Sequence, residues 1–111
     1  MIRAVQAVNR RVMVALDSLG KPMAQRIILS DHARAEARRR GISEAIILGV
    51  ATTPERRLAV RAGREVRQSR IADPASGKLH LIRVVVDSGK DGDTIVTVYR
   101  TSKIRKYWRA Q

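Results

Sequence analysis

The sequence after Pro54 alternates between apolar and polar residues in four successive segments, and this pattern constrains the fold more than any other feature. The segments cover residues 57–61, 65–72, 79–87 and 94–100. A period of two residues is typical of a β-strand with one buried face. The connections DPASGK and SGKDGD are rich in turn-forming residues, so they predict antiparallel hairpins. The second half of the chain is therefore predicted to form a three- to four-stranded antiparallel sheet.

Two short helices are predicted before this sheet, each with a start and a stop signal. Ser30 is a typical N-cap for the stretch DHARAEARRR, and Gly41 is a typical stop. Ser43 opens a second helix, EAIILGVAT, which Pro54 closes. Helices followed by a run of strands are typical of an α+β domain, in which the helices cover one face of the sheet.

Residues 1–22 are predicted to stand apart from this domain, because a Gly-Lys-Pro break at 20–22 comes directly before Met23. Apolar residues three or four apart also predict an additional helix over residues 3–18. The other interpretations are an extension outside the domain, with translation starting at Met23, and an amphipathic transit peptide. The single α+β domain itself is assigned to residues 23–111.

The chain is strongly basic, with 23 Lys and Arg against 10 Asp and Glu and a formal net charge of +13. Charge of this size favours binding to a polyanion. The absence of Cys excludes a disulfide framework and a thiol nucleophile, and it suits a cytoplasmic protein. No apolar run approaches the roughly 18 residues of a membrane-spanning helix, so no membrane association is expected.

His32 is the first candidate for chemistry, because the positive end of the helix dipole disfavours imidazolium in the first helical turn. A neutral imidazole can accept a proton at physiological pH. The alternative is a capping-region residue with a satisfied hydrogen bond. The other histidine, His80, lies in a strand between two Leu residues. Two His without spaced carboxylates make no metal signature, so neither a metal nor a cofactor is expected.

The last strand is expected to divide its side chains between a buried face and an open face. Alternation places Val96 and Val98 on one face and Ile95, Thr97 and Tyr99 on the other. We expect the two valines to pack against the helices. Thr97 and Tyr99 would then point into the opposite, open surface.

Arg83 interrupts the apolar run LHLIRVVV, where an unpaired charge would be costly to bury. Its side chain must therefore reach solvent, a carboxylate or a phosphate. The simplest interpretation is a solvated sheet face with a salt bridge to Glu65 or Asp87. On the strand that begins at Glu65, alternation turns Arg67 to one face and Gln68 to the other.

Basic and aromatic residues surround these candidates and favour RNA as the ligand. The predicted nucleic-acid contacts are Arg34, Arg38, Arg70, Arg100, Lys103, Arg105 and Lys106. The two Tyr and the one Trp all lie within residues 99–108, where they predict stacking on unpaired bases. Trp108 alternatively closes the edge of the sheet. A DNA-reading helix-turn-helix is disfavoured, because the second helix is mainly Ile, Leu and Val.

Three stretches carry a resemblance to a known family: SDHARAEARRRGIS, REVRQSRI and the ending RVVVD…IVTVYRTSKIRKYW. Over residues 27–108 the chain resembles a family of small bacterial proteins known as domain of unknown function 4258. That family is similar in layout to the barnase/EndoU/colicin/RelE group of metal-independent ribonucleases, many of them toxins. Carried over position by position, the family's helix His, strand Arg and Gln, and closing Thr, Tyr and Arg fall on His32, Arg67, Gln68, Thr97, Tyr99 and Arg100.

The resemblance implies an RNA-directed, metal-independent endoribonuclease of toxin type with an acidic antitoxin partner. The expected catalytic residues are His32, Arg67, Arg83, Thr97 and Tyr99. In this hypothesis His32 takes the proton of a ribose 2′-hydroxyl, the two Arg stabilise the charged phosphate and Tyr99 donates a hydrogen bond or a proton. The alternatives are a non-catalytic RNA-binding or ribosome-associated protein, and a protein that acts through a protein partner.

Overall fold

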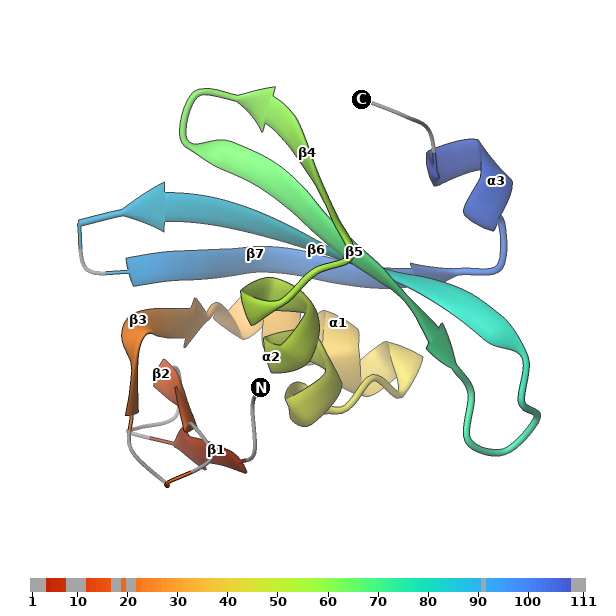
Figure 1. Ribbon diagram of the computed structural model, residues 1–111, viewed down its shortest axis with the longest axis horizontal. Coiled ribbons are helices and arrows are strands. Elements are labelled where there is room, and N and C mark those ends of the chain that lie inside the picture. The colour runs from red at the N-terminus through yellow and green to blue at the C-terminus, as the bar shows by residue number, and fades with distance from the viewer. Residues whose placement is uncertain (1–3, 8–11, 17–18, 20–21, 91, 109–111) are drawn as a thin grey trace.

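The computed structural model describes residues 4–7, 12–16, 19, 22–90 and 92–108. Within these residues it has seven strands and three helices (Figure 1). The strands are β1 (Ala4–Ala7), β2 (Val12–Leu16), β3 (Pro22–Leu29), β4 (Arg56–Arg61), β5 (Arg64–Ala72), β6 (Leu79–Gly89) and β7 (Gly92–Thr101). The helices are α1 (Asp31–Arg40), α2 (Glu44–Thr52) and α3 (Ile104–Tyr107).

The described strands form one sheet in the order β1-β2-β3-β7-β6-β5-β4. Strands β4 to β7 make the predicted antiparallel meander, whereas β3 joins β7 in parallel with Leu29 opposite Ile95. The α+β class is thus confirmed, but the prediction of three to four strands, all antiparallel, is wrong. A parallel pair needs a long connection between its strands. Here that connection contains α1, α2 and β4 to β6, so no local sequence signal reveals the pairing.

The additional helix predicted over residues 3–18 is wrong where the structure describes this segment. β1 and β2 pair antiparallel, with Val5 opposite Ala15, and β2 pairs in turn with β3. Apolar residues in so short a segment fit a helical and a strand period alike, and pairing with a neighbouring strand decides between them. The rest of the segment lies outside the described residues. That residues 1–22 form an extension outside the domain stays a prediction.

The helices α1 and α2 begin and end as their capping residues predict. The Ser30 side chain accepts a hydrogen bond from the backbone N–H of Ala33 at 3.1 Å, and the Ser43 side chain accepts one from Ile46 at 3.2 Å. Gly41 ends α1 with a φ of 67°, a left-handed conformation that suits glycine. Local signals therefore account for the bounds of both helices.

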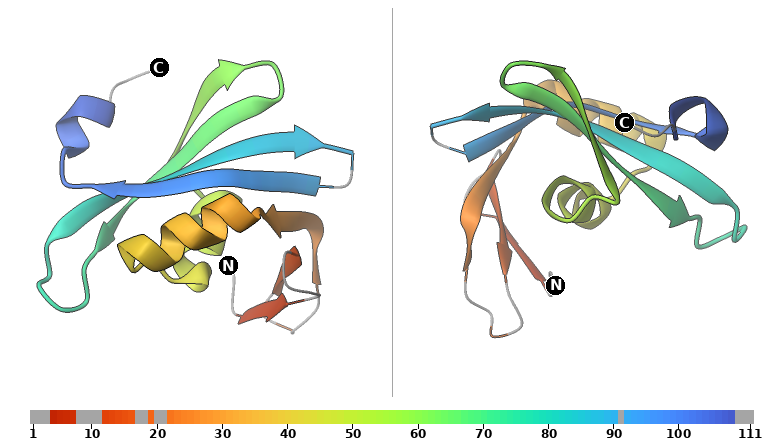
Figure 2. Two further views of the ribbon diagram at one scale, coloured as in Figure 1. Left: turned by 180° about the vertical axis from the view of Figure 1, so that it is seen from behind. Right: turned by 45° about the horizontal axis from the view of Figure 1, so that its top comes forward.

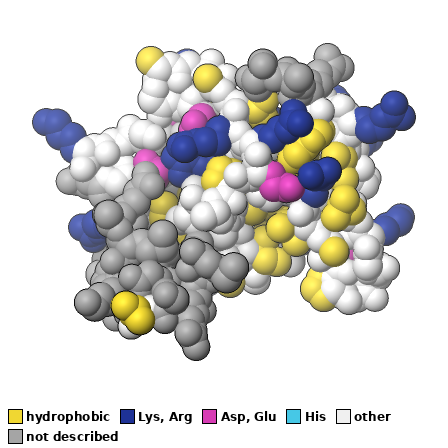
Figure 3. All heavy atoms as spheres, in the orientation of Figure 1, with side chains coloured by type: hydrophobic (Ala, Val, Ile, Leu, Met, Phe, Trp, Pro, Cys, Tyr) yellow, Lys and Arg dark blue, Asp and Glu magenta, His cyan; other side chains and the backbone are white. Residues whose placement is uncertain are grey.

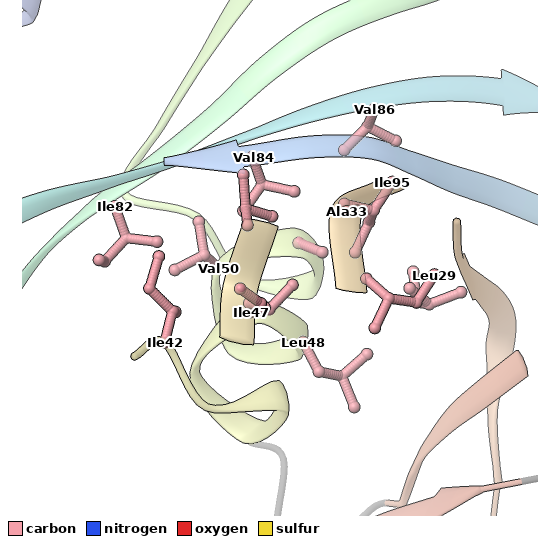
Figure 4. Close-up of a cluster of buried hydrophobic side chains, with 14 residues drawn as sticks. Leu29, Ala33, Ile42, Ile47, Leu48, Val50, Ile82, Val84, Val86 and Ile95 are labelled. Atoms are coloured by element: carbon pink, nitrogen blue, oxygen red, sulfur yellow. The ribbon is translucent and has the colours of Figure 1, made fainter. Parts of the chain in front are cut away.

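A core of aliphatic side chains joins α1 and α2 to one face of the sheet (Figure 4). Leu29, Ile47 and Leu48 are fully buried there, together with Val84 of β6 and Ile95 of β7. Burying one such side chain stabilises a fold by about 1.5–3 kcal/mol. The core thus forms without Phe, as the composition requires.

A β-bulge in β7 changes which residues reach this core. Val85 pairs with Thr97 and Val86 pairs with Ile95, so the register shifts and Val96 has no opposite residue on β6. Ile95 and Val98 are both fully buried against the helices, whereas Val96 is only partly buried. The predicted alternation is therefore wrong at these positions: Ile95, not Val96, belongs to the core. An extra residue in one strand reverses the alternation beyond it.

The two faces of the meander carry different helices. α1 and α2 lie on one side of β5 to β7, and α3 lies on the other side (Figures 1 and 2). The strands β1 to β3 curve toward the side of α1 and α2 (Figure 2). We call the opposite side the α3 face. Its residues include Arg56, Gln68, Arg70, Arg83, Thr97 and Tyr99.

Candidate functional site

Three polar side chains form a row across the α3 face. Gln68 of β5 lies opposite Arg83 of β6, which lies opposite Tyr99 of β7. Arg83 donates from Nε to Gln68 Oε1 at 2.9 Å and from Nη1 to the Tyr99 hydroxyl oxygen. The sheet register alone brings these residues together, although up to 31 positions separate them in the chain. Thr97 lies on the same face, opposite Val85.

Arg83 has no ion pair with any carboxylate of the described residues. The predicted salt bridge to Glu65 or Asp87 is wrong, because both carboxylates bind other arginines. Glu65 accepts hydrogen bonds from Arg57 at 2.9 Å and Arg67 at 2.6 Å. Asp87 binds Arg64 through two hydrogen bonds of 2.5 and 2.8 Å. No carboxylate among the described residues therefore balances the positive charge of the partly buried Arg83 guanidinium.

Tyr99 is held in its neutral form. Burial raises the pKa of the Tyr99 hydroxyl above its ordinary value, and the nearby Arg83 guanidinium only partly opposes this shift. The hydroxyl oxygen accepts from Arg83, and no described residue accepts the hydroxyl hydrogen. Tyr99 can therefore donate a proton or a hydrogen bond at neutral pH, but it is unsuited to act as a base.

Tyr107, the last residue of α3, covers part of this row. The guanidinium of Arg83 lies 4.2 Å from the centre of the Tyr107 ring and 5.3 Å from that of Tyr99. Gln68 Nε2 donates to the backbone carbonyl of Tyr107 at 3.1 Å. The stacked arrangement favours a cation–π attraction between each ring and the charge. All three polar side chains are thus in contact with each other or with α3.

Trp108 lies between two arginines of neighbouring strands. The guanidinium of Arg56 on β4 is 4.5 Å from its ring centre, and that of Arg70 on β5 is 4.4 Å away. Arg70 also pairs with Glu55 at 3.0 Å. Trp108 therefore covers the β4 and β5 side of the α3 face. Because β4 is an edge strand of the sheet, this position agrees with the alternative in which Trp108 closes the sheet edge.

Arg67 lies on the opposite face, although it was a predicted catalytic residue. Its side chain is buried, pairs with Asp93 at 2.8 Å and Glu65 at 2.6 Å, and donates to the carbonyl of Ala51 in α2 at 2.6 Å. Burial opposes the ionisation of Glu65, but hydrogen bonds from Arg57 and Arg67 outweigh it and lower the pKa of this carboxyl. Arg67 thus joins the sheet to α2 and is not part of the Arg83 row.

His32 lies in the first turn of α1, as predicted, and is 67% exposed. Its Nε2 is 3.9 Å from a carboxylate oxygen of Glu36, one turn further along. A hydrogen bond from Arg40 lowers the pKa of Glu36, although partial burial works against it, and Arg39 lowers it further. Arg34 pairs with Glu44 of α2. Residues two apart on a helix point in nearly opposite directions, so His32 points away from α2.

The other predicted RNA contacts do not share one surface. Arg34 and Arg38 belong to α1, whereas Lys103, Arg105 and Lys106 belong to α3 or directly precede it. Arg100 follows Tyr99 on β7 but lies opposite Ile82 on the helix side of the sheet. Figure 3 shows Lys and Arg side chains at the margins and near the centre of one view, some of them beside Asp or Glu. Only Arg70 shares the α3 face with Arg83 among the predicted contacts on the strands.

A pocket of about 250 Å³ lies on the helix side, between the α1–α2 turn and the β5–β6 hairpin. Its lining includes Ile42, Ile46, Ile71, His80 and Arg100. The Nδ1 atom of His80 is buried and has no hydrogen-bond partner among the described residues. His80 is therefore remote from the row on the α3 face.

Two residues of the site, Gln68 and Arg56, are absent from the catalytic residues and RNA contacts expected from the sequence. Gln68 was suggested only by the family resemblance, and Arg56 lay just outside the predicted strand 57–61. Arg56 lies opposite Gln68 in the register of β4 and β5. Only that register, which follows from strand pairing, reveals that both residues face α3.

Among the described residues, no group of three or more His, Asp or Glu side chains is arranged to hold a metal ion. No helix there is long and apolar enough to cross a membrane.

Comparison with known proteins identifies a family. Residues 29–100 match the family described as Domain of unknown function (DUF4258). No curated protein and no solved structure matches the chain. The matched region begins at the last residue of β3 and contains α1, α2, the meander and the row of Gln68, Arg83 and Tyr99. Because the match spans more than half of the chain, this protein belongs to the DUF4258 family.

Proposed function

We propose that the protein is an RNA-directed, metal-independent endoribonuclease of toxin type, with its site on the α3 face. The observation that carries this proposal is the contact between Arg83 and Tyr99. A partly buried guanidinium, which has no carboxylate partner among the described residues, lies beside a hydroxyl that stays protonated. A cation and a proton donor side by side suit a phosphodiester, because charge develops on its oxygens during cleavage.

The proposed reaction is attack of a ribose 2′-oxygen on the adjacent phosphorus. The bond from phosphorus to the 5′-oxygen breaks, which leaves a 2′,3′-cyclic phosphate and a 5′-hydroxyl. Arg83 stabilises the charge on the phosphoryl oxygens, and Tyr99 donates its proton to the departing 5′-oxygen. Thr97, on the same face, is proposed to bind a phosphate oxygen.

His32 remains the proposed acceptor of the 2′-hydroxyl proton. β3 pairs with β7 only up to Ile95, and α1 packs along β7 beyond that point. An RNA strand that passes over this edge of β7 would contact both Tyr99 on one side and α1 on the other. A toxin of this type also requires a neutralising partner, for which we propose an acidic protein that binds the basic surface in the cytoplasm.

The test is incubation of total RNA with the purified protein and three variants. His32→Ala and Tyr99→Phe should each slow cleavage by about 10²- to 10⁴-fold while RNA binding is retained. Arg83→Met should weaken both binding and cleavage. Cleavage that is unchanged in Tyr99→Phe and Arg83→Met would overturn the proposed site, and unchanged cleavage in His32→Ala would overturn the role of His32 alone.

RNA binding without cleavage is the second candidate function. It is favoured by the position of His32, since no described His or carboxylate hydrogen-bonds to Arg83 or Tyr99. A binding protein needs the cations of the α3 face but no base. RNA binding that weakens with salt, without any cleavage product, would select this function.

A further inference from the structure

The α3 segment, residues 103–108, is at most partly buried, and its aromatic rings contact arginines of the sheet. None of the residues of α3 is buried. The segment follows β7 directly, and Ser102 and Lys103 at its start are exposed. Its contacts with the sheet include those of the Tyr107 and Trp108 rings and the hydrogen bond from Gln68 to the carbonyl of Tyr107. A ring that stacks on a guanidinium can be replaced by another flat ring.

The rings occupy the positions where unpaired bases would stack. A guanidinium plane binds a nucleobase and an aromatic side chain by the same stacking. Tyr107 covers Arg83 at 4.2 Å, and Trp108 lies between Arg56 and Arg70 at 4.5 and 4.4 Å. A base that approaches any of these arginines from the α3 side therefore meets a ring of the protein itself.

We infer that the α3 segment competes with RNA, and that single-stranded RNA binds by displacing Tyr107 and Trp108 from these three arginines. One base takes the place of Tyr107 on Arg83, and another takes the place of Trp108 between Arg56 and Arg70. Displacement also opens the Arg83–Tyr99 contact to a phosphate. The inference rests on the proposed function, because it specifies that the RNA is single-stranded and that Tyr107 and Trp108 must move before it binds.

The test compares RNA binding by the full chain and a Tyr107→Ala/Trp108→Ala variant. The probe is a single-stranded oligouridylate with 2′-O-methyl groups, which lacks the free 2′-hydroxyl needed for cleavage. The variant should bind this probe more tightly, on the order of tenfold, because the competing rings are gone. Val60→Ala, which removes an exposed apolar side chain near the far end of β4, is the control and should bind as the wild type does.

The fluorescence of Trp108 gives a second readout, because it is the single Trp of the chain. In the wild type, the probe should make Trp108 more accessible to quenching by acrylamide, since the ring leaves the two arginines. Circular dichroism checks that the double variant is folded, which the absence of buried residues in α3 predicts.

Each outcome bears on the inference. Tighter binding by the variant together with increased quenching in the wild type supports it. Equal or weaker binding by the variant, or a Trp108 that becomes less accessible, overturns it and leaves the proposed function standing, since the wild type still binds RNA. If neither protein binds the probe at low salt, the proposed function and the inference both fail.

Discussion

Arg67 and Arg83 lie on neighbouring strands, and their guanidinium groups point to opposite faces of the sheet. Arg67 lies opposite Val84, which is buried against the helices, and Arg83 lies opposite Gln68, which faces α3. The first arginine is enclosed by two carboxylates and a carbonyl, and the second has a hydroxyl and an amide. This difference gives Arg67 a structural role and leaves the charge of Arg83 without a carboxylate partner among the described residues.

Removing Arg67 should therefore destabilise the fold. Arg67→Met removes a buried guanidinium from the carboxylates of Glu65 and Asp93, the second of which is only 3% exposed. Breaking a buried pair in this way costs about 3–5 kcal/mol of the free energy of unfolding, which urea denaturation measures. Arg64→Met breaks a more exposed pair with Asp87 and should cost much less. Adding Asp93→Asn to Arg67→Met should recover part of the loss, and equal losses for Arg64 and Arg67 would contradict the assignment.

Removing Arg83 should weaken RNA binding and its dependence on salt. The binding constant K falls as salt concentration rises, and Arg83→Met should make the slope of log K against log salt concentration less steep by about 1. This is the effect of one lost phosphate contact. Arg83→Lys keeps the charge but loses the planar stacking and fork of donors, so it should recover only part of the affinity. Titrations of single-stranded RNA at several salt concentrations measure both quantities.

The matched control is Arg100→Met, because Arg100 is exposed and directly follows Tyr99 but lies on the helix side. It removes the same charge from the same strand pair. If Arg100→Met reduced the affinity and the slope as much as Arg83→Met, RNA binding would not be specific to the α3 face.

Local signals predicted much of the fold, and the failures came from distant contacts. Ser30 and Ser43 mark helix starts by hydrogen bonds three residues away, so a short stretch of sequence contains the whole signal. The parallel pair of Leu29 and Ile95 joins segments that are 66 residues apart in the chain. The bulge at Val96 depends on how two strands fit together. Neither leaves a pattern that periodicity can detect.

The residues of the candidate site were also predicted only in part, because distant contacts decide which of them lie together. Arg83 stood out as a charge in an apolar strand, and Tyr99 as a ring on a polar face, so both were identified from their own strands. Arg67 and Arg83 looked alike in sequence, and only the carboxylates of Glu65 and Asp93 around the first distinguish them. The stacking of Trp108 on Arg56 required the register of β4 and the position of α3 together.

Gly92 should not tolerate a side chain. Its φ of 130° is rare for other residues, and an added Cβ would lie 2.5 Å from the backbone oxygen of Arg26 in β3. The strained conformation alone costs about 1–3 kcal/mol, and the clash should add to it, so Gly92→Ala should lower the midpoint of urea unfolding. Gly41→Ala is the control, because Gly41 has a φ of 67° but no atom within 4 Å of an added Cβ. A smaller loss for Gly92→Ala than for Gly41→Ala would contradict close packing of β3 on β7.

Tyr99 should make the stability of the protein depend on pH in alkaline solution. Burial raises the pKa of its hydroxyl in the folded state, so folding favours the neutral form. The resulting stability is fully present below the pKa of an unfolded tyrosine, about 10, and is lost as pH rises through the higher pKa of the folded state. Urea unfolding of the wild type and Tyr99→Phe at a series of pH values isolates this contribution, because other titrating groups are common to both proteins. The wild type should lose more stability than the variant above about pH 10; parallel curves would show that the Tyr99 hydroxyl is not desolvated beside Arg83.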